Sequence, residues 1–196
     1  MQDFRDDAAS HEMLAYHCPR YQEFPRIELY MDQVLTILEE ALRPFALNDK
    51  EKLITSTMVN NYVKQGVVMP PKKKRYSCEH LAYLMTVCIL KQVLPLSDIC
   101  QLIKLQISTC PLQQAYDYFC DALEASLQSV FMQGMAGNMR TSSLPEGELI
   151  YCVTLAFANK MYLQKYLQYR RREGIVTLPR PLQTSQTLSL PEQTIG

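Results

Sequence analysis

The sequence predicts an all-α protein that contains at most two very short strands. Over most of the chain, apolar residues recur every three or four positions, the period of a helix that buries one face. Prolines and cap-forming residues interrupt this pattern at intervals typical of short helices. The chain has only 6 glycines in 196 residues, too few for a large antiparallel sheet or a Gly-rich nucleotide-binding fold.

Length and composition indicate one ordinary domain with an appended helical part. Hydrophobic residues make up 47% of the chain and charged residues 20%, a globular balance. No apolar run approaches the roughly 20 residues that a membrane span requires, so we expect a cytoplasmic protein that does not bind membranes. The 7 cysteines form no Cys-x-x-Cys pair, which favours free thiols over a disulfide framework or a zinc site.

The first two segments are an irregular arm and a helix. Residues 1–27 show no clean period and include two prolines, Pro19 and Pro25, so we expect an arm without regular structure. From Leu29 the apolar positions mark one face of a helix over residues 29–43. Pro44 ends this helix, because proline lacks the amide hydrogen and its ring clashes with the preceding turn.

The next segment is a short helix followed by a basic loop. Thr55 or Ser56 can cap the helix, and Gly66 can supply the left-handed residue that follows its end. A β-branched stretch, two prolines and a run of four cations come next, and they predict two very short strands around a basic loop. The residues of this stretch are Val67, Val68, Met69, Pro70, Pro71, Lys72, Lys73, Lys74 and Arg75.

Two further helices complete residues 28–108. Ser77 is the expected cap of the first, which Pro95 ends, and Ser97 is the expected cap of the second.

The second half of the chain predicts two longer helices. Pro111 begins the first, in which apolar positions four and three residues apart form a seam about 20 residues long. The seam consists of Leu112, Tyr116, Phe119, Leu123, Ser126 and Val130. Gly134 and Gly137 close this helix, and Pro145 opens the last one, which is apolar nearly all round from Leu149 to Ala158 and is expected to be buried. We divide this half into a helical part at 109–175 and a disordered tail at 176–196.

The net charge of zero hides an uneven distribution. Residues 1–51 carry 5 basic and 11 acidic side chains, whereas residues 52–110 carry 8 basic and 2 acidic ones. The remaining residues, 111–196, carry 7 of each sign. A basic middle segment in a neutral chain indicates an anionic partner for that segment.

Residues 55–105 resemble the DNA-binding head of the mercury-resistance-regulator (MerR-type) winged helix-turn-helix family. That head has a Tyr, then a Gly and two apolar residues, a wing with proline, an Arg-Tyr pair and a Leu-rich helix. The corresponding positions here are Tyr62, Gly66, Val67, Val68, Pro70, Pro71, Arg75, Tyr76, Leu81, Leu84 and Ile89. The resemblance implies a winged helix-turn-helix head at residues 28–108 with a minimal two-stranded wing, and a homodimer formed through the C-terminal helices.

A second resemblance is narrower. The run Met-Val-Asn-Asn-Tyr-Val-Lys at residues 58–64, followed by Lys-Arg-Tyr at 74–76, is similar to a bacterial family known only as a domain of unknown function. This likeness extends over roughly residues 25–150 and implies no particular activity. In the wider MerR-type family, a basic residue usually stands at the position of Asn60 and an aromatic one at that of Asn61.

The residues themselves favour double-stranded DNA as the partner. Asparagine side chains can bond adenine in the major groove, and a cluster of cations can neutralise phosphates. The start of the helix at Thr55 offers free amides to a phosphate. The candidate DNA-binding residues are Thr55, Ser56, Thr57, Asn60, Asn61, Lys64, Lys72, Lys73, Lys74, Arg75 and Tyr76.

The expected function is therefore a sequence-specific transcriptional regulator, and the alternative is a protein–protein interaction module that keeps the winged scaffold without DNA binding. The sequence does not name an operator or a small-molecule effector. No phosphate loop, nucleophile elbow or metal triad is present. Cys78 and His80 lie two residues apart and point to different sides of a helix, so we place His80 at the surface. We expect no enzyme activity, no cofactor and no metal.

Overall fold

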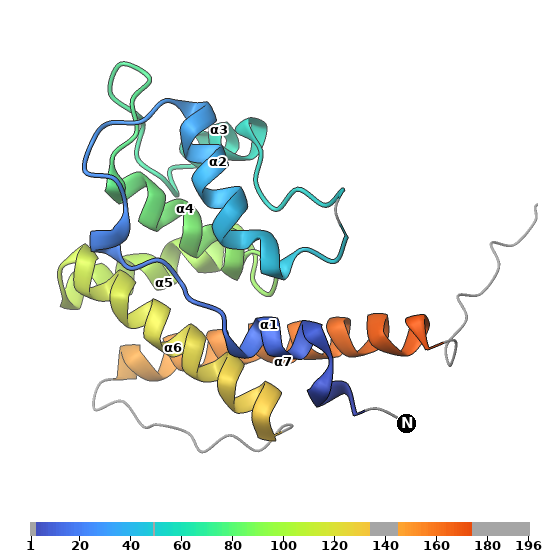
Figure 1. Cartoon of the computed structure of the whole chain (residues 1–196). Helices are drawn as coiled ribbons and strands as arrows, with labels where there is room; N and C mark the ends of the chain where they lie inside the picture. Colours follow the sequence, from blue (N-terminus) through green and yellow to red (C-terminus); the bar gives the residue numbers. More distant parts are fainter. Residues whose placement is uncertain (1–2, 49, 134–144, 174–196) are drawn as a thin grey trace, which may run out of the picture.

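The structure, a computed structural model, describes residues 3–48, 50–133 and 145–173 (Figure 1). These residues form seven α-helices and three short 3-10 helices, and no extended strand occurs among them. The all-α prediction is therefore confirmed. The α-helices are α1 (Ala8–Leu14), α2 (Met31–Leu42), α3 (Ser56–Lys64), α4 (Cys78–Leu90), α5 (Leu96–Thr109), α6 (Leu112–Gln133) and α7 (Pro145–Arg172), and the 3-10 helices are η1 (Phe4–Asp6), η2 (Tyr21–Glu23) and η3 (Arg43–Phe45).

Helices α2, α3 and α4 begin and end close to the positions that the sequence predicts. The Thr55 side chain caps α3, and Ser77 caps α4. The start of α5 differs, because Pro95 rather than Ser97 is the residue that precedes it. Pro95 has the extended backbone that a cap position requires, and its lack of an amide hydrogen costs nothing at a helix start.

Helices α6 and α7 pack against each other along the predicted seam. From Tyr116 to Val130 every seam residue is buried, and Ser126, the polar one, shares a hydrogen bond of 3.0 Å with Thr154 of α7. This bond satisfies both buried hydroxyls, so the seam is occupied within a single chain. Gly134 and Gly137, expected to close α6, lie outside the described residues.

The prediction that α7 is buried all round from Leu149 to Ala158 is wrong. Ile150 and Phe157 are buried against the rest of the protein, but the Leu149 side chain is 47% exposed, and Cys152 and Ala156 are also exposed. The reason is that α7 lies at the edge of the molecule (Figure 1), where the other helices cover only one side of it.

The prediction of an irregular arm is wrong for residues 3–27, which form η1, α1 and η2. Phe4 and Met13 are fully packed, with 2% and 1% of their surface exposed. The Phe4 ring lies 5.4 to 5.6 Å from the rings of Tyr162, Tyr166 and Tyr169 on α7. These buried residues fall on several short elements that change direction, so they share no helical period.

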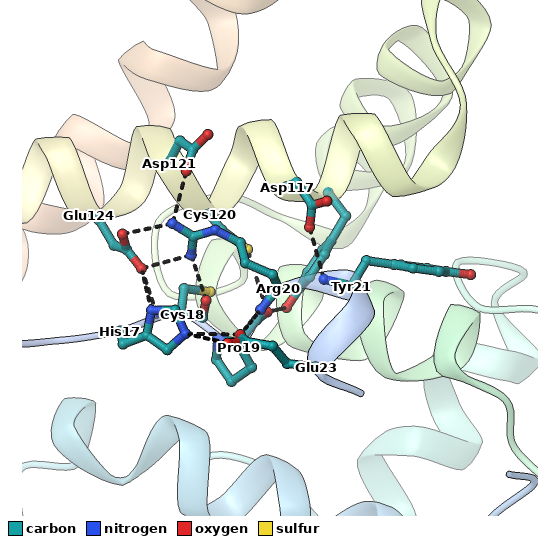
Figure 2. Close-up of polar contacts among 11 residues, drawn as sticks. His17, Cys18, Pro19, Arg20, Tyr21, Glu23, Asp117, Cys120, Asp121 and Glu124 are labelled. Atoms are coloured by element: carbon teal, nitrogen blue, oxygen red, sulfur yellow. Dashed lines mark hydrogen bonds and ion pairs between the residues drawn. The ribbon is translucent and has the colours of Figure 1, made fainter. Parts of the chain in front are cut away.

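A polar cluster fastens the end of this arm to α6 (Figure 2). Two guanidinium nitrogens of Arg20 donate to the Glu124 carboxylate at 2.7 and 2.8 Å, and the Cys18 amide donates to the same group at 2.8 Å. The Tyr21 amide donates to Asp117 at 2.8 Å. Partial burial opposes ionisation of Glu124, but the hydrogen bonds from Arg20 and Cys18 outweigh it and lower the pKa of the carboxyl group below its ordinary value.

One continuous hydrophobic cluster runs through the described residues from the arm to α7. It joins residues of the 28–108 segment, such as Val34 and Leu84, to residues of the following helices, such as Phe131 and Phe157. All 7 cysteines are free, and only Cys152 is exposed. The tail expected at residues 176–196 lies outside the described residues.

Candidate nucleic-acid interface

Helix α3 has a well-defined beginning and end. The hydroxyl of Thr55 accepts a hydrogen bond of 3.2 Å from the Met58 amide and so satisfies one of the free donors of the first turn. At the other end Gly66 has a φ of 71°, which residues with a side chain rarely adopt. The amides of Gly66 and Val67 return to the carbonyls of Val63 and Tyr62, both at 3.0 Å, forming a Schellman motif.

The two faces of α3 divide as the sequence predicts. Val59 and Tyr62 are buried, with 0% and 3% of their surface exposed. The opposite face carries short polar side chains and one cation, all exposed: Ser56, Thr57, Asn60, Asn61 and Lys64. The Asn61 oxygen accepts a hydrogen bond of 3.1 Å from the Gln65 side chain, one turn later on the same face. This face makes no contact with the core, so its residues are available to a partner.

The basic loop forms a tight two-residue turn. The Arg75 amide donates to the Lys72 carbonyl at 2.8 Å, and these two residues form an isolated antiparallel bridge. Lys73 and Lys74, at the tip, have φ values of 50° and 61°. Two consecutive positive φ angles are the mark of a type I′ turn, where asparagine and glycine are the preferred residues. Lysine at both positions therefore holds the backbone in an unfavourable conformation.

The two short strands expected around this loop do not form. A second isolated bridge joins Leu29 and Tyr76, whose amides and carbonyls exchange hydrogen bonds of 2.8 and 2.9 Å. Each bridge involves one residue pair. Pro70 and Pro71 lack the amide hydrogens that would extend the Lys72–Arg75 bridge toward the preceding residues. The loop is thus a hairpin with minimal pairing, and we call residues 72–75 the basic hairpin.

Tyr76 does not belong to the exposed set. The side chain is 4% exposed, and its ring meets the His80 ring edge-on with 5.4 Å between centroids. The expectation that His80 lies at the surface is also wrong: 7% of the residue is exposed, and its Nδ1 accepts hydrogen bonds from the amide and hydroxyl of Ser77. Histidine here completes the cap of α4, so Tyr76 and His80 anchor the hairpin to the core.

Sequence reasoning missed Tyr30 as part of this surface. Its ring is 49% exposed, and the guanidinium of Arg75 lies over it at 3.8 Å from the ring centroid. This cation–π contact holds Arg75 against the start of α2. Tyr30 falls in phase with the apolar face of α2, so periodicity assigned it to the core.

The stretch of chain that contains α3 and the basic hairpin carries cations and no carboxylates. Six basic residues and no Asp or Glu occur between Lys52 and Cys78. In Figure 1, α3 and the loop that contains the basic hairpin lie at the end of the molecule opposite α6 and α7. The cations of this stretch are Lys52, Lys64, Lys72, Lys73, Lys74 and Arg75.

Helix α3 rests on the end of α4. Lys91, which follows α4, lies with its ammonium 5.9 Å from the Tyr62 ring centroid and 3.8 Å from the Met58 sulfur. Burial lowers the pKa of the Lys91 ammonium from its ordinary value. The orientation of α3 is therefore fixed by core contacts, independently of its exposed face.

The described residues form neither a metal-binding cluster nor a membrane-spanning helix. No group of three or more His, Cys, Asp or Glu side chains comes together there in a way that could hold a metal ion. None of the helices in residues 3–48, 50–133 and 145–173 combines the length and apolarity that crossing a membrane would take.

Comparison with known proteins identifies one family. Neither the curated proteins nor the solved structures contain a significant match. A family model described as a domain of unknown function (DUF1836) matches residues 19–119, from the arm through α2, α3, the basic hairpin, α4 and α5 to the first turns of α6. The match covers more than half of the 196 residues. The chain therefore belongs to the DUF1836 family.

Proposed function

We propose that this protein is a sequence-specific regulator of transcription that binds double-stranded DNA in the cytoplasm through a winged helix-turn-helix head of MerR type. In this proposal α3 enters the major groove, and the basic hairpin contacts phosphates beside it. The observation that carries it is the combination of an exposed polar face on α3 with two strained lysines on a hairpin, in a stretch without carboxylates.

The chemistry of α3 suits base recognition. The amide side chains of Asn60 and Asn61 are exposed and can bond N6 and N7 of adenine in pairs. Lys64, one turn later, can reach a phosphate. Ser56 and Thr57 lie in the first turn, where free amides and the helix dipole attract an anion.

The strain in the basic hairpin supports a role for its lysines. Left-handed backbone costs a residue other than glycine roughly 1–2 kcal/mol. Asparagine and glycine would avoid most of this cost at Lys73 and Lys74. Strained backbone conformations cluster at functional sites. Two ammonium groups at the tip of a rigid turn are well suited to phosphate contacts.

The way in which α3 and the basic hairpin are joined to the core supports a winged arrangement. The Leu29–Tyr76 bridge ties the base of the hairpin to the residues just before α2, and Tyr76 leads directly into α4. The buried ring of Tyr62 holds α3 to the same core. A rigid connection of this kind would let a helix and a hairpin contact one duplex in a fixed relation.

A selection from random duplexes tests base recognition. At physiological salt the parent protein is expected to enrich a defined motif. Asn61→Ala should weaken one position of that motif by about 1–3 kcal/mol, with little effect on stability. The matched control is Gln128→Ala, which removes an exposed amide from α6 and should leave the motif intact. No enriched motif with the parent protein would refute the proposal.

A salt titration tests the hairpin. Each phosphate contact contributes about −0.9 to the slope of log affinity against log salt. Lys73→Ala with Lys74→Ala should therefore flatten this slope by roughly one to two units. The control removes two exposed lysines outside that basic stretch, Lys50 and Lys104, and should leave the slope unchanged. Equal slopes for the hairpin variant and the parent would show that the hairpin is not part of the interface.

One observation favours the second candidate, a protein–protein interaction module without DNA binding. Tyr30 and Met69, which both precede the basic hairpin in sequence, are 49% and 48% exposed. Large exposed apolar side chains beside a polar surface are common in protein interfaces. If the protein is an interaction module, duplex binding should be weak and unselective, and Asn61→Ala should not change it. The double variant Tyr30→Ala with Met69→Ala should instead abolish binding to the protein partner.

A further inference from the structure

Lys165 of α7 is a buried cation without a close acceptor among the described residues. Only 6% of the residue is exposed. Its ammonium lies 3.5 Å from the Ala46 carbonyl oxygen and 3.7 Å from a carboxylate oxygen of Glu12. An ammonium has three hydrogens to donate, and its bonds to charged acceptors are normally about 2.7–2.9 Å long. Because a buried charge is costly unless it is well paired, Lys165 is suited to hold a further anionic acceptor.

Lys165 lines a cavity that several parts of the chain enclose. The cavity has a volume of about 560 Å³, within the range of roughly 300–1,000 Å³ that small-molecule sites have. Its walls come from α1, the end of α2 with η3, residues 46–48 and 51–53, and α7. Figure 1 shows the end of α2 and the loop after it beside α7, and the Gln168 side chain donates to the Leu47 carbonyl across this boundary. The walls are thus joined to one another, which gives the cavity a defined shape.

The walls carry charges of both signs in equal number: Glu12, Glu39, Arg43, Glu51, Lys52 and Lys165. Two of the carboxylates have partners in the fold. Lys52 lies 3.9 Å from Glu39, and Glu51 accepts a hydrogen bond of 2.7 Å from a backbone amide. The Arg43 side chain is exposed and forms no ion pair within the described part of the chain. Two cations, Arg43 and Lys165, and one carboxylate, Glu12, therefore remain for a ligand.

This set of charges selects among small ligands. A carboxylate matches the two cations, and an ammonium group matches Glu12. An α-amino acid carries both groups on one carbon atom, and the 3.7 Å between Lys165 and Glu12 places their counterparts close together as well. A phosphate would share the cavity with three carboxylates, and like charges repel. The cavity is also lined by three leucines, Leu42, Leu47 and Leu53.

We propose that this cavity binds a free α-amino acid with an apolar side chain. Lys165 and Arg43 hold its carboxylate, Glu12 accepts hydrogen bonds from its ammonium group, and the three leucines contact its side chain. The site includes no residue of α3 or of the basic hairpin, and its occupancy is measured without DNA. Failure of this proposal and failure of the DNA-binding proposal are therefore separate results.

Thermal unfolding of the full chain with added amino acids is the first test. The probes are L-valine, L-leucine, L-isoleucine, L-methionine and L-phenylalanine. At about a hundred times its dissociation constant, the preferred probe should raise Tm by about 5–10 °C, because it binds the folded chain and not the unfolded one. No rise with any of the five probes would overturn the proposal. A rise with inorganic phosphate alone would overturn it as well.

Two analogues of the preferred probe test the pairing of charges. One is the acid without the amino group, and the other is the amine without the carboxylate. In calorimetry each should bind at least about tenfold more weakly than the amino acid, because a charge of the site then has no counterpart. An analogue that binds as tightly as the amino acid would overturn the proposal.

Variants assign the groups of the site. Lys165→Met keeps the length of the side chain, removes the charge and should weaken amino-acid binding at least about tenfold. Arg43→Gln, at an exposed position, should also weaken it. The matched control, Arg171→Gln, removes an exposed arginine outside the cavity and should leave the affinity unchanged. Glu12→Gln should abolish the preference for the amino acid over the acid without the amino group. If Lys165→Met does not fold, the Arg43 and Glu12 variants decide, and parent-like binding by both of them would overturn the proposal.

Discussion

Replacing the two lysines at the tip of the basic hairpin should make the protein more stable and a weaker DNA binder at the same time. The variant is Lys73→Asn with Lys74→Gly, the pair of residues that type I′ turns prefer. In the parent, φ values of 50° and 61° place both lysines in the left-handed region while the Arg75 amide still closes the turn at 2.8 Å.

The magnitude follows from the backbone. Two left-handed lysines cost about 2–4 kcal/mol together. Glycine at position 74 reduces the gain by about 0.5–1 kcal/mol, because it loses more conformational freedom on folding than lysine does. Asparagine at position 73 relieves only part of the cost of the left-handed backbone there. The net gain in the free energy of unfolding is therefore about 1–2 kcal/mol. For a protein of this size, that corresponds to a rise in Tm of roughly 2–8 °C.

Urea denaturation and duplex binding, measured on the same preparations, separate the two effects. The control variant, Lys73→Ala with Lys74→Ala, loses the same two charges but keeps side chains that disfavour the turn. Both variants should bind duplex DNA more weakly, and only the Asn-Gly variant should be more stable than the parent. No gain in stability would refute the strain argument, and a gain with unchanged affinity would refute the role of the lysines.

Three further outcomes follow from the structure. Tyr62→Ala should lower the free energy of unfolding by about 3 kcal/mol or more, because the ring is 3% exposed beneath α3; a smaller loss in urea denaturation would contradict its role as an anchor. Gly66→Ala should cost about 1 kcal/mol despite the open space around it, since only its φ of 71° is unfavourable for alanine; an equally stable variant would argue against the Schellman end of α3. Hydrogen bonds in the folded protein lower the pKa of the Glu124 carboxyl group. The ionised carboxylate therefore stabilises the fold fully above the unfolded-state pKa of about 4.3. This stabilisation is lost as the pH falls through the lower pKa of the folded state. The stability advantage of the parent over Glu124→Gln, measured in urea between pH 7 and pH 3, should therefore shrink toward the acid end; a constant difference would contradict the Arg20 pairing.

The helices and their ends were predictable because their signals are local. Thr55 lies one residue before α3, Gly66 lies two residues after it, and both act through backbone groups within a few positions. The seam of α6 was also predictable, since residues from Tyr116 to Val130 repeat with the period of a helix that buries one side. Among the site residues, the exposure of Asn60 and Asn61 followed from the same periodicity.

The parts that sequence reasoning missed depend on contacts between distant residues. Phe4 packs on tyrosines of α7 that lie more than 150 positions later, and no local pattern encodes this contact. Tyr76 counted as a surface residue because it follows four cations, yet its pairing with Leu29 buries it. The turn at Lys73 carries none of the glycine or asparagine signals that reveal a type I′ turn.

The way the arm is held has a consequence for biosynthesis. The Tyr21 amide donates to Asp117, which lies 96 positions later in the chain, and Asp7 pairs with Arg172, which lies 165 positions later. At about 5–20 residues per second of translation, roughly 8 to 33 s separate the synthesis of Asp7 from that of its partner. During that interval Phe4 and Met13 have no α7 to pack against, so the arm is among the last parts of the chain to reach its native contacts. A nascent chain of this protein therefore exposes the apolar surface of the arm until α6 and α7 have left the ribosome, which makes the arm a natural binding site for chaperones acting during translation.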